Sequence, residues 1–221
     1  MIEPTLQFQS FGKIPRWSRE ICITEKIDGT NAQVAIFDRN EIQKHEIDNP
    51  TVPFLSVKDE NGYDWLMIAG SRKRWISKDD DNYGFGAWVS ENREELVKLG
   101  PGRHYGEWWG KGIQGRYNDF VDDKRFSLFN VSLFNAENAP ECCLVVPIIY
   151  NGLVSDEKIW QSVKLLKDKG SIAAPGCMNA EGIMIYHIAG NCYFKKTLEN
   201  DQQHKTMYTG IYRYLKRQYW S

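Results

Sequence analysis

The stretch Glu20 to Phe37, EICITEKIDGTNAQVAIF, combines a strand-like pattern with residue types that can do chemistry. Apolar and polar residues alternate before Lys26 and again after Asn31, which is typical of a half-buried β-strand. The Asp-Gly pair between them usually marks a hairpin turn. Lysine is rarely buried without a partner, so an inward Lys26 needs a reason. A lysine whose pKa is lowered by burial or by a neighbouring cation offers a free amine, which is a nucleophile.

Taken alone, the Lys-x-Asp-Gly pattern at Lys26 favours the plainer interpretation, a hairpin that carries an exposed lysine. A pattern of three fixed residues is expected by chance in about one chain of this size in twenty. Evidence for chemistry must therefore come from other segments of the chain.

Five further segments supply that evidence, because they resemble the motifs of the covalent nucleotidyltransferases in that family's order. The family comprises ATP-dependent DNA ligases, RNA ligases and mRNA capping enzymes, and its nucleotidyl-lysine motif resembles EKIDGTN. The other segments are GSRKRW, HYGEWWGKGIQGRY, FSLFNV, AEGIMIYH and CYFKKT. Together the motifs cover about residues 20 to 197. The run GKGIQ and the asparagine after DGT are most similar to RNA ligases.

The resemblance implies a role for one or more residues of each motif. Lys26 is the implied nucleophile that forms a lysine–AMP phosphoramidate, and Lys195 neutralises the α-phosphate and helps Lys26 lose its proton. Glu181 and Asp28 are the implied ligands of Mg²⁺ or Mn²⁺, which suit carboxylate and water oxygens, with Asp28 acting in the later steps. These four residues form the implied catalytic group. The residues implied to bind ATP are Glu25, Lys26, Asn31, Arg72, Glu107, Phe129, Glu181, Lys195 and Lys196.

Three of these assignments have alternatives. Glu107 is implied to hold the ribose, but a strand carboxylate between glycine-rich turns could also be structural. Phe129 is implied to lie against the purine, although a different strand register would place Phe126 there. Lys195 and Lys196 should point to opposite faces of a regular strand, so one of them is expected on the surface.

The elements that must position these residues are mostly strands. Ser155 is expected to cap a helix that ends before Gly170, and Ser90 to open another that ends at Gly100. Neither a βαβ rhythm nor a glycine-rich phosphate loop is present. We expect an α+β fold, the nucleotidyltransferase (ATP-grasp-like ligase adenylation) domain of mainly antiparallel sheets with flanking helices. The predicted strands are Ile21–Thr24, Ala32–Phe37, Trp65–Ala69, Phe126–Phe134, Leu144–Tyr150, Gly182–Ile188 and Asn191–Lys195.

Composition limits the possible partners and compartment. A net charge of −1 argues against a generally basic surface, so any nucleic-acid contact must come from a local patch. No apolar run approaches the roughly 20 residues of a membrane span, and the N-terminus lacks the apolar region of a signal peptide. Five cysteines without metal-type spacing indicate reduced thiols. We expect a cytoplasmic protein, in the host cytoplasm if it is viral.

The whole chain, residues 1–221, is expected to form one adenylyltransferase domain without an OB-fold. Only 25 residues follow Lys196, which is too few for that fold. The basic and aromatic tail at 198–221 fits either a nucleic-acid-binding segment or a helix docked on the domain. Arg72 is expected in the site, whereas Lys73 and Arg74 fit a solvated run.

The sequence therefore predicts an ATP-dependent RNA ligase that joins nucleic-acid ends bearing a 5′-phosphate and a 3′-hydroxyl. A minimal DNA ligase is the nearest alternative, because recognition of a 2′-hydroxyl can depend on one or two side chains. A guanylyltransferase is disfavoured by the expected lack of an OB-fold. A non-catalytic nucleic-acid-binding relative is the alternative from another class. A lone ligase domain could depend on a separate end-healing enzyme, although no residue indicates one.

Overall fold

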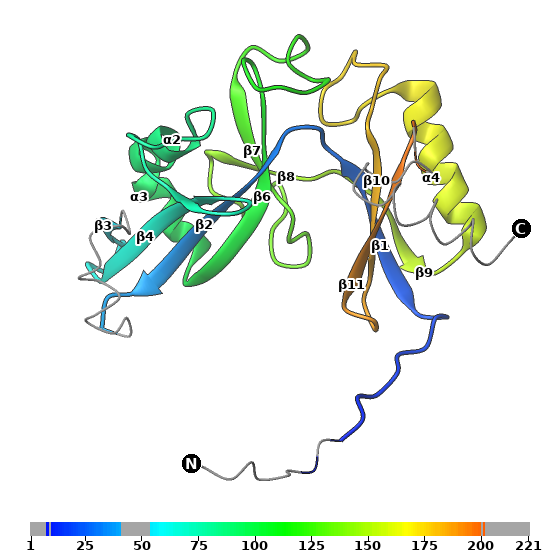
Figure 1. The fold of residues 1–221 in the computed structure, drawn as a ribbon, viewed down its shortest axis with the longest axis horizontal. Coiled ribbons are helices and arrows are strands. Elements are labelled where there is room, and N and C mark those ends of the chain that lie inside the picture. Colours follow the sequence, from blue (N-terminus) through cyan, green and yellow to red (C-terminus); the bar gives the residue numbers. More distant parts are fainter. Residues whose placement is uncertain (1–7, 9, 41–53, 200, 202–221) are drawn as a thin grey trace, which may run out of the picture.

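The computed structural model describes residues 8, 10–40, 54–199 and 201, and two β-sheets diverge within them (Figure 1). All strand pairs are antiparallel except β7 with β8. The four-stranded sheet has the order β11-β10-β1-β9, with β1 (Glu20–Lys26), β9 (Ile148–Leu153), β10 (Gly182–His187) and β11 (Cys192–Thr197). The seven-stranded sheet has the order β3-β4-β2-β6-β7-β8 with β5 beside β4. Its strands are β2 (Thr30–Asp38), β3 (Leu55–Lys58), β4 (Asp64–Ser71), β5 (Trp75–Ile76), β6 (Gly102–Gly110), β7 (Lys124–Leu128) and β8 (Cys143–Val145).

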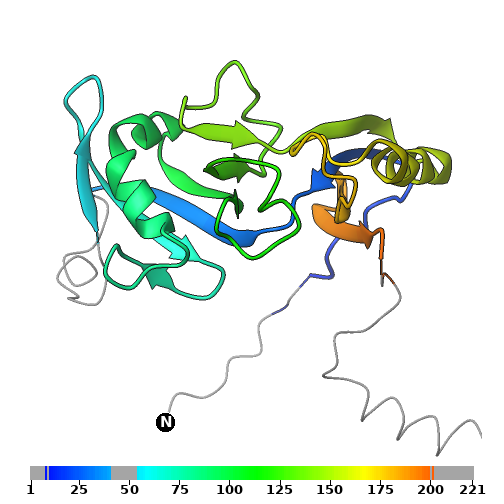
Figure 2. The same cartoon turned by 90° about the horizontal axis from the view of Figure 1, so that it is seen from above.

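Helices cover the outer face of each sheet, as Figure 2 shows from above. The seven-stranded sheet packs against α2 (Phe85–Glu91), α3 (Arg93–Leu96) and the 3₁₀ turn η1 (Val97–Leu99), and α4 (Asp156–Lys169) packs against the four-stranded sheet. The expected α+β class is confirmed. In the described part of the chain no helix is long and apolar enough to cross a membrane.

The Asp-Gly pair after Lys26 does not form a hairpin. Strand β1 ends at Lys26 in one sheet, and β2 begins at Thr30 in the other, so the short link crosses between the sheets (Figure 1). Gly29 permits this crossing, because a Cβ there would lie 2.5 Å from the Trp108 carbonyl oxygen and 2.7 Å from the Trp109 Cβ. The strand break therefore places Lys26 where the two sheets meet.

One helix prediction is confirmed and the other is wrong at its start. Helix α4 begins after Ser155, whose hydroxyl accepts a hydrogen bond from the Lys158 N–H, and ends at Gly170. Ser90, in contrast, lies inside α2. The helix begins earlier because the Asp81 carboxylate accepts the backbone N–H groups of Gly86 and Ala87 at 2.6 and 3.0 Å. The capping residue, Asp81, lies before the segment whose pattern predicted the helix.

Two predicted strands are too long. The segment expected at Phe126–Phe134 ends at Leu128, because Asn130 starts a turn in which its side-chain oxygen accepts a hydrogen bond from the Ser132 hydroxyl at 2.6 Å. The segment expected at Leu144–Tyr150 is two strands, β8 and β9, which belong to different sheets. Pro147 lies between them and has no N–H for a ladder.

The predicted tail at 198–221 lies almost entirely outside the described residues.

Candidate active site

A cavity of about 1470 Å³ lies where the two sheets meet. Every residue predicted to bind ATP lines this cavity except Lys196, and Asp28 lines it as well. The motifs that contribute these residues are spread over both sheets and the links between them. The fold thus collects residues that lie far apart in the sequence into one cavity.

Lys26 and Glu181 form an ion pair in the cavity. The Lys26 Nζ lies 2.5 Å from the Glu181 Oε2, and the side chains are 22% and 19% exposed. The pairing of β1 with β10 causes this contact, because Lys26 lies opposite Gly182, the first residue of β10. Glu181 immediately precedes that glycine. An amine and a carboxylate are therefore held together in a partly desolvated place.

Glu107 approaches this pair from the other sheet. It lies on β6 opposite Asn31 of β2, so both of these predicted residues occupy one cross-strand position at the cavity. Burial raises the pKa of the Glu107 carboxyl to about 7. The charge of Lys26 and a hydrogen bond from the Gly29 N–H lower it, and the charges of Glu181 and Asp28 raise it further. A buried carboxyl of this kind gains a partner when a hydroxyl donor binds beside it.

The two phenylalanines of the FSLFNV motif lie in different environments. Phe126 is fully buried in the core between the seven-stranded sheet and α2. Phe129 follows the end of β7, is half-buried and lines the cavity. Its backbone N–H donates to the Tyr105 carbonyl at 2.9 Å, which fixes its position beside β6. Of the two rings, Phe129 is the one available to a ligand.

The lysines of β11 point to opposite faces, as their alternation predicts. Lys195 is exposed and lines the cavity. Lys196 lies on the face toward α4, where its Nζ pairs with Asp201 at 2.9 Å and lies 4.6 Å from the Trp160 ring centroid. The structure therefore places Lys196 away from the cavity and does not support the cofactor contact predicted for it.

The basic residues of the segment SRKRW also lie in different places relative to the cavity. Arg72 is exposed and lines the cavity, whereas Lys73 and Arg74 do not line it. Arg74 pairs with the Asp80 carboxylate at 2.5 Å. The placement agrees with the expectation that Arg72 is the arginine at the site.

Glu25 has a buried carboxylate that is fully hydrogen-bonded within the protein. It accepts the Tyr117 and Ser171 hydroxyls on Oε1 at 2.9 and 2.5 Å, and the Ile172 and Ala173 N–H groups on Oε2 at 2.8 and 3.0 Å. These four bonds use the capacity of a carboxylate. Any contact between Glu25 and a nucleotide would therefore involve its main chain and not its carboxylate.

Tyr117 is a site residue that the sequence interpretation missed. Its hydroxyl donates to Glu25 and accepts the Glu181 N–H at 3.4 Å, so it joins the residue before Lys26 to the residue that pairs with Lys26. Burial and the Glu25 carboxylate raise the pKa of the Tyr117 hydroxyl far above its usual range, which keeps it a donor. A lone tyrosine after GIQGR gives no signal of this role in the sequence.

Arg116, the residue before Tyr117, was also missed. Its backbone N–H donates to the Asp28 carboxylate at 3.0 Å, and its Nε lies 3.5 Å from the same oxygen. The guanidinium also donates to Asn179 at 2.8 Å and to Glu199 at 3.1 Å. Arg116 thus holds Asp28 at the cavity wall and links it to the segments that flank β10 and β11.

The two predicted metal ligands fit a hard divalent cation. Asp28 and Glu181 both line the cavity, where their carboxylates also pair with Arg116 and Lys26. Within the described residues, no group of three or more His, Cys, Asp or Glu side chains forms a closed metal site. Mg²⁺ commonly uses one or two carboxylates together with water and substrate phosphates, so an open donor set of this kind suits it.

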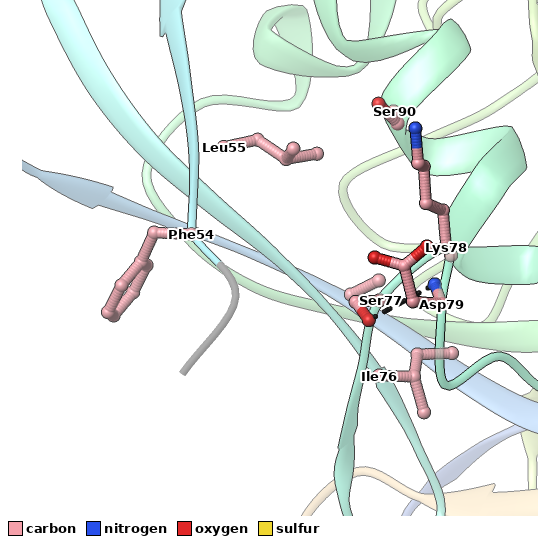
Figure 3. A pocket seen from close by; sticks show the side chains of 9 residues that line it. Phe54, Leu55, Ile76, Ser77, Lys78, Asp79 and Ser90 are labelled. Carbon is pink, nitrogen blue, oxygen red and sulfur yellow. Dashed lines mark hydrogen bonds between the residues drawn. The ribbon is translucent and has the colours of Figure 1, made fainter. Parts of the chain in front are cut away.

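A second hollow, of about 200 Å³, lies on the helix-covered side of the seven-stranded sheet (Figure 3). The Asp79 N–H donates to the Ser77 hydroxyl beside it. None of the predicted site residues lines this hollow.

Comparison with known proteins gives a family model and several similar structures. The model described as RNA ligase matches residues 19–197. A Naegleria gruberi RNA ligase, in a lysine-to-alanine variant with ATP and Mn, is 16% identical with a TM-score of 0.51, over 81% of this chain and 50% of that chain. An apo lysine variant has the same identity and coverage with a TM-score of 0.50. An arginine variant with ATP and Mn is 14% identical with a TM-score of 0.50, over 91% and 52%.

These structural similarities concern the fold, because the identities are low. The chain spans about half the length of the solved structures that it matches. No curated protein matches it significantly.

Proposed function

The chain belongs to the RNA ligase family, and from this premise we propose that it is an ATP-dependent polynucleotide ligase that joins RNA ends through a lysyl-AMP intermediate. The observation that carries the proposal is the convergence of Lys26, Glu181, Glu107 and Lys195 on one cavity. The similar Naegleria gruberi structures with ATP and Mn support the use of a nucleotide and a divalent metal.

In the first step, the Lys26 amine attacks the α-phosphate of ATP. A nitrogen–phosphorus bond forms, the bond to pyrophosphate breaks, and the amine loses a proton. The Glu181 Oε2 lies 2.5 Å from the Lys26 nitrogen and is within reach of that proton. The cation of Lys195, on β11 two strands away from β1, offsets charge on the phosphate oxygens.

Binding of ATP uses residues from both sheets. Glu107 accepts a ribose hydroxyl, Phe129 lies against the purine, and Arg72 offers a guanidinium to phosphate oxygens. Asp28 and Glu181 would hold Mg²⁺ or Mn²⁺. When bound, the metal would neutralise phosphate charge and orient pyrophosphate as the leaving group.

The later steps transfer AMP to RNA and seal the strand. The 5′-phosphate of one end attacks the lysyl-AMP phosphorus and releases the Lys26 amine. The 3′-hydroxyl of the second end then attacks the 5′-phosphate phosphorus and expels AMP. Asp28, which Arg116 holds at the cavity wall, would act in these steps as a metal ligand.

Intact-mass spectrometry after incubation with ATP and magnesium tests the proposal. The protein should gain the mass of one AMP, whereas Lys26→Ala should gain none. Radiolabelled ATP and GTP compared side by side test the guanylyltransferase alternative, which requires labelling by GTP. Adenylylated RNA, DNA and hybrid nicks then identify the substrate, and sealing of all-DNA nicks alone would reject RNA. A protein that binds RNA and forms no adduct with any divalent metal would be a non-catalytic relative.

A further inference from the structure

Two tyrosines form an aromatic pair on the cavity wall of the four-stranded sheet. Tyr186 on β10 and Tyr193 on β11 lie directly opposite each other, with ring centroids 4.6 Å apart and planes inclined by 31°. The Tyr186 hydroxyl donates to the Asn191 side chain at 2.8 Å. Both rings line the cavity, and Tyr193 is 61% exposed. The function proposed above assigns no role to this pair.

The pair lies on the same wall as the catalytic group but farther along the strands. Tyr186 is paired with Cys22, and Gly182 with Lys26. Four residues of strand separate the two positions, which corresponds to about 13 Å. Lys195 lies between them, on the same face of β11 as Tyr193. The wall therefore presents the catalytic amine, the cation of Lys195 and an aromatic surface in that order.

The opposite wall carries a cation and another exposed ring at β6. Arg103 and Tyr105 alternate with Glu107 along this strand, and both line the cavity. The Arg103 guanidinium lies 5.1 Å from the Trp75 ring centroid and 5.4 Å from that of Phe37. Within the described residues it forms no ion pair with a carboxylate. Its charge therefore remains available to a phosphate.

We infer that this part of the cavity is a subsite for an unpaired base at the end of an RNA strand, with the base on Tyr193 and Tyr186, and that Arg103 on the opposite wall offers its charge to phosphates of the same strand. Aromatic rings beside cations are the usual means of binding single-stranded nucleic acid, because every base has a face that can stack. The inference rests on the proposed ligase function and extends it to the substrate, which must enter with an unpaired end.

The size of the cavity supports an occupant beyond ATP. Pockets for single small ligands commonly measure about 300–1,000 Å³, and this cavity measures about 1470 Å³. The groups proposed to bind ATP, among them Glu107 and Lys26, lie at the end of the cavity where the two sheets meet. A fully paired duplex end is less suited to the tyrosine pair, because its bases are hydrogen-bonded to each other and only the terminal pair has an open face.

Binding of fluorescent RNA to the full chain tests the subsite. The probe is a 5′-phosphorylated single strand of about ten nucleotides, and a fully paired RNA duplex with the same sequence is the second probe. Tyr193→Leu should weaken single-strand binding about tenfold, while Tyr193→Phe, which keeps the ring, should bind like the wild type. Duplex binding should be the same for all three proteins. If the leucine variant is unstable, Tyr193→Thr repeats the test, because threonine favours β-strands.

Trp160→Leu is the matched control. Trp160 is 60% exposed, like Tyr193, and lies beside Lys196 on the helix side of the four-stranded sheet. Tyr193 and Lys195 lie on the cavity side of the same sheet. This variant should bind RNA like the wild type. Equal losses in Trp160→Leu and Tyr193→Leu, or no loss in Tyr193→Leu, would overturn the inference.

Self-adenylylation with ATP alone, measured on the same proteins, separates this inference from the proposed function. A Tyr193→Leu variant that lost adenylylation in proportion to RNA binding would place the tyrosines in the ATP site and overturn the subsite. A wild-type protein that formed no adenylate, yet bound RNA through Tyr193, would disprove the ligase proposal and leave the subsite standing.

Discussion

Glu25 and Lys26 are consecutive residues of β1 whose side chains point in opposite directions. The Glu25 carboxylate is 1% exposed and accepts four hydrogen bonds within the protein. The Lys26 amine lies in the cavity against Glu181. Strand alternation separates the two side chains, so the buried carboxylate fixes the backbone from which the amine projects.

Glu25→Gln should lower the free energy of unfolding by about 3 kcal/mol, because the amide turns an N–H donor toward groups that are themselves donors. Urea unfolding monitored by tryptophan fluorescence measures this loss. Glu20→Gln is the control, since Glu20 is exposed at the start of the same strand. It should change stability by less than about 0.5 kcal/mol. Equal effects of the two changes would argue against a structural role for Glu25.

Tyr117→Phe should slow self-adenylylation about fivefold and leave the KM for ATP nearly unchanged. The change removes the hydroxyl between Glu25 and the Glu181 N–H but keeps the ring, whose edge contacts Trp109 at a centroid distance of 5.7 Å. A lost hydrogen bond of about 1 kcal/mol that aligned Lys26 with Glu181 corresponds to this rate effect. Single-turnover labelling with radioactive ATP measures it.

Tyr150→Phe is the matched control for Tyr117→Phe. The Tyr150 hydroxyl donates to the Leu153 carbonyl at 2.9 Å, and the residue does not line the cavity. The rate of adenylylation should be unchanged in Tyr150→Phe, and the loss of stability should be smaller than in Tyr117→Phe, because the Tyr150 bond is exposed and the Tyr117 bond is buried. A raised KM for ATP in Tyr117→Phe, with an unchanged maximal rate, would instead assign Tyr117 to nucleotide binding.

The sequence was most informative where one residue type in a motif carries the chemistry. Lys26, Glu107, Glu181 and Lys195 could be named in advance because their segments resemble nucleotidyltransferase motifs in that family's order, and all four line the cavity. Strand alternation separated Lys195 from Lys196.

The sequence could not reveal interactions that depend on pairing between distant segments. Asp81 caps α2 from outside the helical pattern, and Pro147 divides a continuous apolar run between two sheets. The role of Tyr117 depends on Glu25 and Glu181, which are 92 and 64 residues away in the chain. No local periodicity encodes contacts of this range.

Because of the Glu107 carboxyl, the free energy of unfolding should fall as the pH rises from about 5 to 7. Its pKa is about 7 in the folded protein against 4.5 for an ordinary glutamate. Between these values the folded state holds a proton that the unfolded state has released, so the free energy of unfolding falls with rising pH. The shift corresponds to at most about 3 kcal/mol. Urea unfolding across this range measures the slope.

Glu107→Gln should remove this contribution, because the amide does not titrate. His104 has a pKa lowered by burial and acts in the opposite direction, so that its contribution to stability grows as the pH rises. Both proteins contain His104, and the difference between their pH profiles therefore isolates Glu107. Parallel profiles for the two proteins would contradict the raised pKa.

Lys195→Ala should slow self-adenylylation and Lys196→Ala should not, although the two lysines are adjacent. Lys195 faces the cavity, and its removal should lower the rate of self-adenylylation at least about a hundredfold, the usual effect of deleting one charge-stabilising group. Lys196 is held by Asp201 and lies over Trp160, so its removal should cost less than about 1 kcal/mol of stability and leave the rate within about twofold. Radioactive ATP labelling and thermal melting of both variants measure these effects. A rate loss in Lys196→Ala as large as that in Lys195→Ala would mean that β11 presents its other face to the nucleotide.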